Sequence, residues 1–465
     1  METKKTYIVY FVICILMLPV SIVKAQQVII ETELKLLLDD AVQNSKTVQI
    51  EQQNAQQAAN NRTKALKTYM PTVGVTTSYT HLNDAITFPG NLETLLMGTQ
   101  QLLIKEQLGL GFNAPFPAGI PLAEVEPLQV QNIFRATLEA DMVLFTGLQA
   151  PRLAKAAEHQ QRAYEALGDK EATSVIQQTI QMYKSLALMN KSEQVLENSE
   201  KRLAEQSRFV AKAVEKGLAT ELEESRIELA RQQLQQKWIE LNTQRQLALA
   251  MLSQLTGKPI DSLQTLNPEL KEWMVDYSTQ NIANRPELRA LTEAELATEF
   301  KKKSAYGAYM PKVKLFGKRE LYEDDLSLLD PEWMVGVGMS WNLFDGLKRT
   351  EDVQNAKLDV TKITLQKEQA QELLQVGLQK AALEYEATNQ QIAVAEQRVE
   401  TAKKAYRILE KQYQVGLAPQ RDFLDSENEL QQAELGMSKA VFDQNMAAVN
   451  YLIAGGSLQH LIGQQ

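Results

Sequence analysis

The side chains of this chain that could do chemistry are few. The 465 residues include three histidines, His81, His159 and His460, and one cysteine, Cys14. No histidine forms a His-x-x-x-His or glutamate-flanked metal motif, and none accompanies a nucleophile signature. His159 lies among polar residues of a helical pattern, where we expect it to be solvated. The sequence therefore predicts no enzyme, no metal site and no cofactor site.

Two glycine-rich segments do not indicate a nucleotide site either. Gly455-Gly456-Ser457 follows a helical pattern and no strand precedes it, so it predicts a helix end and not a phosphate-binding loop. Gly336 and Gly338 alternate with apolar residues, which is typical of a strand that another group approaches closely.

The N-terminal residues predict a secretory signal peptide that is cut after Ala25. Two lysines precede an apolar run from Tyr7 to Val23, and small residues follow. A membrane anchor is the alternative, but the run is shorter than the span of about 20 residues that a membrane requires. Residues 1–25 hold three Lys and one Glu, so their removal changes the net charge from −9 to −11, and it also removes Cys14. We expect no disulfide and no nucleic-acid binding from such an acidic, exported chain.

Glycines recur along the chain at a constant offset of 199 residues. The pairs are Gly147 and Gly346, each in a Leu-Phe-x-Gly-Leu segment, Gly217 and Gly416, each in a Gly-Leu-Ala segment, and Gly257 and Gly456. A register held without gaps over about 110 residues predicts that one structural unit is duplicated. We expect the two repeats to cover residues 26–260 and 261–465.

Four segments alternate apolar and polar residues and predict strands, at 72–80, 135–145, 312–319 and 333–344. The first and third follow a Tyr-Met-Pro segment, whose proline ends the preceding helix. These two segments are 240 residues apart, so the first strand connection is 41 residues longer than its counterpart. We expect this connection, residues 81–132, to be a long loop with a short helix near residues 95–108.

Helical patterns occupy the rest of each repeat. A helix at 31–68 precedes the first strand, and stretches of about 70 residues follow residues 149 and 347. Seventy helical residues span about 105 Å. Helical patterns resume at 221–254 and 422–452, so Gly217 and Gly416 predict turns with positive φ between paired helices. Apolar residues spaced alternately three and four apart predict a coiled-coil seam, at Ile392, Ala395, Val399, Ala402, Tyr406, Leu409 and Tyr413.

After residue 25, no segment has the length and apolarity of a transmembrane helix, so any membrane crossing would use strands. A closed transmembrane barrel needs about eight strands or more, whereas each chain offers four. Several chains must then share one barrel, and three chains would supply twelve strands. The residues alone leave the number of chains open.

The order of these motifs resembles the TolC family of outer membrane efflux proteins. The segments that carry the resemblance are Tyr69-Met70-Pro71, Tyr309-Met310-Pro311, the two Leu-Phe-x-Gly segments, Asn284-Arg285-Pro286-Glu287-Leu288 and the run from Tyr413 to Ser426. The resemblance implies a mainly α homotrimer in which a shared twelve-stranded β-barrel continues into a long α-helical barrel. It also implies an outer membrane channel that extends into the periplasm of a Gram-negative bacterium and serves a tripartite efflux or type I secretion system.

The resemblance further implies which residues meet the partners. The channel would contact outer membrane lipid, a periplasmic adaptor and, through it, an inner-membrane pump. The family's adaptor-contact motif falls at two glycine turns, where Lys216 replaces the expected valine in the first copy. The contact residues carried over are Val415, Gly416, Leu417, Gly217 and Leu218.

A pore gate is implied beside the second turn. The family's acidic rings correspond to Asp422 and Asp425, which lie three residues apart and hence on one helix face. Tyr413 matches the family's constriction tyrosine, and Glu223 is the acidic residue of the first copy. The family's basic partner is absent, since Ala418 takes its position; Arg421 could replace it. A favourable interaction with the start of the helix is the alternative role for Asp422.

A periplasmic coiled-coil scaffold or adaptor without a pore is the alternative function. The predicted strands argue against it, because they end in aromatic residues such as Trp341 and Phe344, which suit a bilayer interface.

Overall fold

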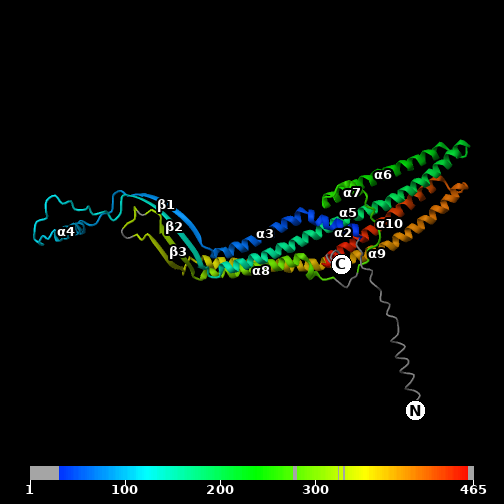
Figure 1. The fold of residues 1–465 in the computed structure, drawn as a ribbon. Helices are drawn as coiled ribbons and strands as arrows, with labels where there is room; N and C mark the ends of the chain where they lie inside the picture. The colour runs from blue at the N-terminus through cyan, green and yellow to red at the C-terminus, as the bar shows by residue number, and fades with distance from the viewer. Residues whose placement is uncertain (1–30, 276–279, 323, 328–329, 459–465) are drawn as a thin grey trace, which may run out of the picture. The chain divides into compact units, whose positions relative to one another are not determined.

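A computed structural model describes residues 31–275, 280–322, 324–327 and 330–458 of the protein. The predicted signal peptide, Cys14 and His460 lie outside these residues. The described chain is mainly helical, with four strands and two pairs of long helices (Figure 1).

The first half of the chain contains two helices, a first strand, a helix in the connection, a second strand and a long helical pair. These are α2 (Thr32–Asn44), α3 (Lys46–Leu66), the 3-10 turn η1 (Lys67–Tyr69), β1 (Thr72–His81), α4 (Gly90–Gln107), β2 (Asn132–Phe145), α5 (Gln149–Glu215), α6 (Glu221–Thr256) and α7 (Ile260–Gln264).

The second half repeats this order without a helix between its strands. Its elements are η3 (Ile282–Asn284), α8 (Pro286–Tyr306), η4 (Gly307–Tyr309), β3 (Lys312–Glu320), β4 (Trp333–Ser340), α9 (Lys348–Gln414) and α10 (Gln420–Ala454).

The described residues form two compact units. The first unit comprises the residues up to 57, residues 160–295 and those from 362 onward, and it contains most of both helical hairpins, including their turns. The second comprises residues 58–159 and 296–361, and it contains the sheet. Each unit combines residues of both predicted repeats, and the boundary between repeats at residues 260 and 261 stays a prediction. None of the described helices has both the length and the apolarity that a membrane crossing requires.

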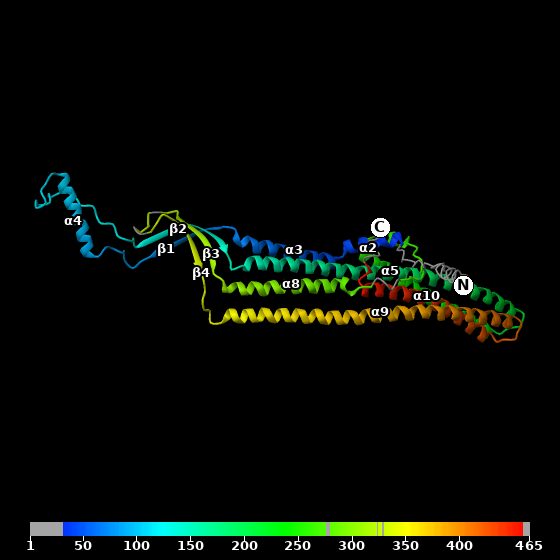
Figure 2. The ribbon, with the colours of Figure 1, turned by 90° about the horizontal axis from the view of Figure 1, so that it is seen from below.

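The four strands form one antiparallel sheet in chain order, β1-β2-β3-β4 (Figure 2). Thr72 pairs with Asp141 and His81 with Asn132, so β1 and β2 run in register over their whole shared length. A bulge between Val143 and Phe145 shifts the pairing of β2 with β3. The sheet confirms the four predicted strands.

The strand register separates apolar from polar side chains. Val73 pairs with Ala140, which pairs with Gly317, which in turn pairs with Val335, so these residues share one face. The edge strands expose this apolar face through Val73, Val75 and Tyr79 on β1 and Trp333, Val335, Val337 and Met339 on β4. Alternate residues such as Glu139, Asp141, Lys314 and Lys318 place charges on the other face.

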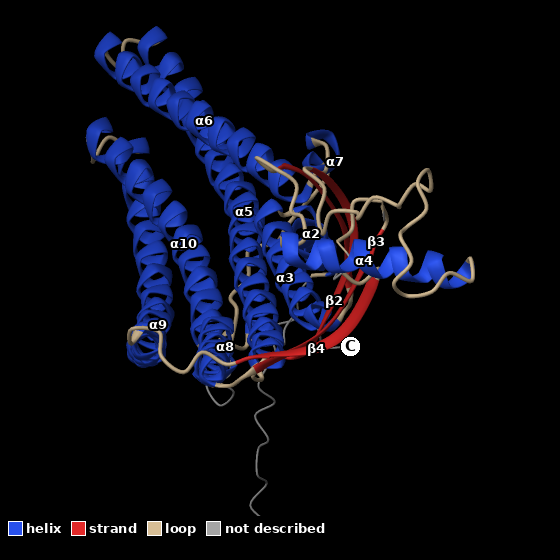
Figure 3. Cartoon of the chain, turned by 90° about the vertical axis from the view of Figure 1, so that its left-hand side faces the viewer, coloured by secondary structure: helices blue, strands red, loops and turns tan. Residues whose placement is uncertain are grey.

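The two long helical pairs are antiparallel hairpins, α5 with α6 and α9 with α10 (Figure 3). Pro151 lies in the first turn of α5. N–H groups in the first turn have no partner within the helix, so a proline, which lacks this group, is tolerated there. The predicted seam of α9 is confirmed, because Ile392, Val399 and Tyr406 are buried and the seam residues between them are half-buried. Ile176, Ile180 and Tyr183 of α5 are likewise buried in the main core.

The predicted duplication is visible in the backbone itself. Eight residues with positive φ form four pairs at the offset of 199, which are Gly147 and Gly346, Leu148 and Leu347, Gly217 and Gly416, and Gly257 and Gly456. Two of these residues are leucines, which rarely adopt this conformation. The paired conformations show that both copies turn in the same way at the same places.

Several predicted elements have different bounds in the structure, and the second strand begins at Asn132, three residues earlier than predicted. The first predicted helix is interrupted at Ser45, whose hydroxyl accepts a hydrogen bond from the N–H of Val48 at 3.3 Å and so caps α3. The helix in the long connection begins at Gly90, earlier than predicted. The fourth strand ends at Ser340 and not at 344, because Ser340 pairs with Lys312, the first residue of β3.

Candidate functional site

The predicted contact residues lie on the two hairpin turns, which have one geometry. Gly217 has φ +67° and Gly416 has φ +76°, values that favour glycine. The N–H of Gly217 donates to the carbonyl of Val214 at 2.9 Å, and the N–H of Leu218 donates to that of Ala213 at 2.8 Å. The second turn repeats both bonds. This pattern of two backbone hydrogen bonds ends a helix and satisfies its last carbonyl groups.

Each turn presents a leucine to solvent. Leu218 and Leu417 are each 79% exposed, and Val415 is 69% exposed. A leucine at this position of a helix end often packs back on the last helical turn, but neither leucine does so here. Nothing lies within 4 Å of a Cβ placed on either glycine. The turns are therefore apolar, exposed and free of steric hindrance within this chain.

The two predicted gate aspartates are exposed near the start of α10. Pro419 occupies the capping position and makes no side-chain cap, so Asp422 lies in the first turn beyond the cap. Its carboxylate is favourably placed for the positive end of the helix. Arg421 extends to Asp425 of its own helix at 3.7 Å, with both side chains more than two-thirds exposed. Such an exposed pair contributes little stability, and both aspartates remain accessible.

Tyr413 is part of an aromatic cluster and not a lone side chain. Its ring stacks on Phe423 with centroids 5.6 Å apart and meets the edge of Phe209 at 6.0 Å. The ring of Tyr406 also contacts Phe423, with centroids 5.6 Å apart. Burial, together with the negative charge of Glu223, raises the pKa of the Tyr413 hydroxyl above its ordinary value. The cluster joins the ends of α5, α9 and α10 beside the turns.

The two hairpins are linked near their turns by a residue that the sequence analysis did not select. The side-chain amide of Gln420, which is 1% exposed, donates to the backbone carbonyl of Glu223 at 2.6 Å. The backbone of Glu223 is thus hydrogen-bonded to the second hairpin. The carboxylate of Glu223 is half-buried, and its negative charge acts on the hydroxyl of Tyr413. Glu223 therefore lies near Tyr413 and near Gln420, the direct neighbour of Arg421, in one region of the first unit.

A buried ion pair joins the same hairpins deeper along the helices. Glu427 of α10 accepts hydrogen bonds from Arg202 of α5 at 2.7 and 2.9 Å and from the hydroxyl of Ser199 at 2.6 Å. The side chain of Glu427 is only 5% exposed. Burial raises the pKa of Glu427 above the ordinary range of a glutamate, because loss of hydration outweighs the bonds from Arg202 and Ser199.

Further polar groups extend this pair to α6. Gln431 donates to Ser199 at 2.9 Å and accepts from the ammonium of Lys237 on α6. A groove of about 380 Å³ runs beside these groups and includes the predicted residues Arg421 and Asp425 in its lining. A sequence signal for this network exists, since Glu427 falls four residues after Phe423 and three before Leu430, where the buried stripe of α10 predicts an apolar residue.

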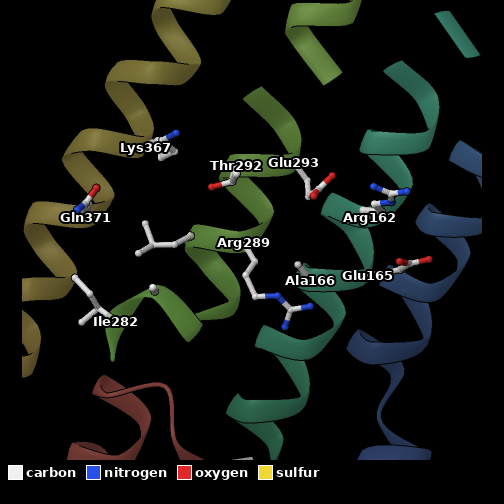
Figure 4. Close-up of a pocket in the computed structure, with 11 residues that line it drawn as sticks. Arg162, Glu165, Ala166, Ile282, Arg289, Thr292, Glu293, Lys367 and Gln371 are labelled. Atoms are coloured by element: carbon white, nitrogen blue, oxygen red, sulfur yellow. The ribbon is translucent and has the colours of Figure 1, made fainter. Parts of the chain in front are cut away.

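Another cavity lies elsewhere in the first unit, between α5, α8 and α9 (Figure 4). It has a volume of about 700 Å³, and its lining contains none of the predicted site residues. Two of its basic groups are paired, Arg289 with Asp169 at 3.1 Å and Lys367 with Glu295. Within the described residues, no group of three or more His, Cys, Asp or Glu side chains is arranged to hold a metal ion.

Comparison with known proteins identifies the fold, and one family model matches part of the chain. Residues 278–452 match the outer membrane efflux protein family. The chain is similar to the outer-membrane channel OprN, with a TM-score of 0.71 and 16% identity over 92% of this chain and 90% of that one. The CmeC outer membrane channel of Campylobacter jejuni gives 0.69 and 17% over 92% and 86%, and the outer membrane protein VceC of Vibrio cholerae gives 0.68 and 15% over 91% and 96%. No curated protein matches the chain.

Proposed function

We propose that this protein, whose residues 278–452 match the outer membrane efflux protein family, is the outer membrane channel of a tripartite efflux or type I secretion system. Three copies form a passive duct from the periplasm to the exterior of a Gram-negative cell. A periplasmic adaptor and an inner-membrane pump engage the duct and load it.

The observation that carries this proposal is the two-faced sheet. Its apolar face is exposed on β1 and β4, and its opposite face carries charged residues such as Asp141 and Lys314. An exposed apolar surface of this kind indicates a partner or a lipid environment. A strand in the outer membrane needs apolar residues toward lipid and polar residues toward a lumen. A coiled-coil scaffold without a pore would not explain a sheet with an exposed apolar face.

The edges of the sheet support the sharing of strands between copies. β1 and β4 each pair on one side only within the described chain, so their outer N–H and C=O groups have no strand partner there. Such edges are usually covered or paired. Pairing of β1 of one copy with β4 of the next would satisfy them, and three copies arranged in this way give a closed ring.

The hairpin turns suit the contact with an adaptor. Leu218, Val415 and Leu417 expose apolar side chains on turns that are fixed by glycine and by two backbone hydrogen bonds each. A rigid turn with an exposed apolar side chain loses little conformational entropy when a partner covers it. We assign the adaptor contact to these residues together with Gly217 and Gly416.

The gate is assigned to the groups beside the second turn. Asp422 and Asp425 are exposed on one helix face. Around a threefold axis they form two carboxylate rings, which attract cations. Tyr413 and Phe423 brace the turn, and Gln420 holds the two hairpins together where the family's basic residue is absent. Arg421 of the same helix partly compensates the negative charge of Asp425.

Membrane fractionation tests the location and the function class together. We expect the protein to sediment with the outer membrane on a density gradient and to need detergent for its extraction. Recovery in a periplasmic extract without detergent would instead support a scaffold or adaptor without a pore.

The adaptor contact is tested by placing a photo-cross-linking amino acid at Leu417. We expect it to capture a periplasmic adaptor, identified by mass spectrometry. The matched control carries the same amino acid at Leu373 of α9, which is also exposed but lies far along the helix from the turn. Equal capture from both positions would contradict the assignment of the turn.

A further inference from the structure

The helix α4, in the connection between β1 and β2, has an apolar face that its own chain leaves uncovered. None of its residues is buried. Its five leucines lie within an arc of about 120° at 100° per residue. They are Leu92, Leu95, Leu96, Leu102 and Leu103. Leu95 is 64% exposed and Leu103 is 61% exposed.

The chain's own contacts involve the other side of the helix. Met97, Gln101, Ile104 and Lys105 are half-buried and point away from the leucine face. Lys105 also reaches the backbone carbonyl of Phe112 in the following loop at 3.4 Å. The helix therefore uses its less apolar side for contacts within the chain, while its most apolar side faces outward.

The charge of the connection disfavours a lipid surface as the partner. Residues 82–131 contain five acidic residues and one basic residue, Lys105, which gives a net charge of −4. Helices that lie in a membrane interface are rich in Lys and Arg, which attract anionic headgroups. An acidic connection is repelled by phosphate-bearing lipids. The leucine face therefore suits an apolar protein surface.

The position of α4 in the chain indicates which protein this is. The connection leaves β1 at His81, and β1 is an edge strand of the sheet. In the proposed trimer, on which this step rests, β1 pairs with β4 of a neighbouring copy. The connection that leads to each α4 therefore begins beside a junction between copies. Among the described residues, the first strand connection has a helix of this kind and the second has none, so a trimer has one such leucine face per chain.

We propose that the leucine face of α4 packs against the same face of α4 in the neighbouring copies, so that three helices form a cap over the end of the sheet. Leu92, Leu95, Thr99 and Leu102 are spaced three, four and three residues apart, as in a coiled-coil seam. Thr99 satisfies its hydroxyl within its own helix by donating to the carbonyl of Leu95. It can thus lie in an apolar seam without an unpaired polar group.

Single-cysteine cross-linking in the outer membrane tests this contact. The background variant Cys14→Ser removes the native cysteine, and Leu95→Cys then places one thiol on the leucine face. We expect a short bis-maleimide to shift most of this variant from a monomer band to a dimer band on a denaturing gel. The matched control, Gln101→Cys, places the thiol on the opposite face of the same helix and should stay monomeric. Leu103→Cys should behave like Leu95→Cys.

A native gel of the same samples separates the two ways in which the inference can fail. Trimers without a cross-link at residue 95 or 103 would overturn the α4 contact and leave the proposed channel intact. Quenching of a fluorophore on Leu95→Cys by spin-labelled lipids would overturn it as well, because the occupant would then be the membrane. Absence of trimers would overturn both the contact and the trimeric channel.

Discussion

Removal of the Arg202 guanidinium should destabilise the region near the hairpin turns in a pH-dependent way. Arg202 donates two hydrogen bonds to Glu427, whose carboxylate is almost fully buried. Removing one partner of a buried ion pair typically costs about 3–5 kcal/mol, because the remaining charge has no compensation. For Arg202→Met, which keeps the apolar stem, we expect a loss of about 3 kcal/mol at pH 8.

Lowering the pH should reduce the stability that Arg202→Met loses. The pKa of Glu427 is already raised in the folded protein, and removal of Arg202 raises it further. A raised folded-state pKa means that the folded protein binds the proton more readily than the unfolded chain, so stability falls as the pH increases above about 4.3, the ordinary pKa of glutamate. Near pH 4 the carboxyl group is protonated and neutral, and the loss should fall to about 1 kcal/mol, the net value of a lost hydrogen bond.

Hydrogen exchange read by mass spectrometry measures this effect locally, without requiring the whole channel to unfold in one step. A loss of about 3 kcal/mol reduces amide protection about a hundredfold. We expect this reduction in peptides around residues 199–206 and 424–431 at pH 8, with protection corrected for the intrinsic exchange rate at each pH. Arg231→Met is the matched control, because Arg231 pairs with Glu228 on α6 and both side chains are more than half exposed.

Two results would refute the reasoning about this ion pair. One is an equal loss of protection for Arg202→Met at pH 8 and near pH 4. The other is a loss at pH 8 no greater than that of Arg231→Met. The double variant Arg202→Met with Glu427→Leu should recover most of the protection, since an apolar pair of similar volume is often neutral in stability. Gln431 would still satisfy Ser199 in that variant.

Three further predictions follow from the turns and the gate. Gly147→Ala should cost about 3 kcal/mol or more of stability, because its Cβ would lie 2.4 Å from a carbonyl oxygen of η4. Gly346→Ala has a similar φ but open space around it, so it should cost about 1 kcal/mol. Equal melting temperatures of the two detergent-solubilised variants would contradict this difference. Gly416→Pro should abolish adaptor-dependent efflux and leave trimers in the outer membrane, and retained efflux would contradict it. Replacement of Asp422 and Asp425 by Asn should weaken block by multivalent cations in planar bilayers, and unchanged block would exclude the carboxylate rings.

Much of the fold could be predicted because local signals agree with each other. The alternation of the strands, the prolines that precede two of them and the glycines of the turns each point to one element. The differences arise where a longer-range partner decides. β4 ends early because β3 begins at Lys312, so Trp341 instead donates its indole N–H to the carbonyl of Tyr309 at 3.0 Å. Periodicity within one segment cannot indicate where its partner strand begins.

The candidate site was predictable only in part. The turns at Gly217 and Gly416 could be predicted because their spacing repeats along the chain. The gate roles of Tyr413, Asp422 and Asp425 were implied by the family resemblance and stay predictions. The links between hairpins were not found, because Gln420, Glu427 and Gln431 are polar residues whose burial depends on helices distant in sequence. Polar residues at buried positions of a helical stripe were the available signal, but which residues they meet requires the tertiary structure.

The claim that this protein is a channel is tested most directly by conductance in planar lipid bilayers. Purified protein, folded in detergent, would be added to one side of a bilayer while the current is recorded. We predict discrete, lasting steps of ion conductance, each from the insertion of one trimer. Helical, trimeric protein that inserts into the bilayer and produces no conductance would contradict the account.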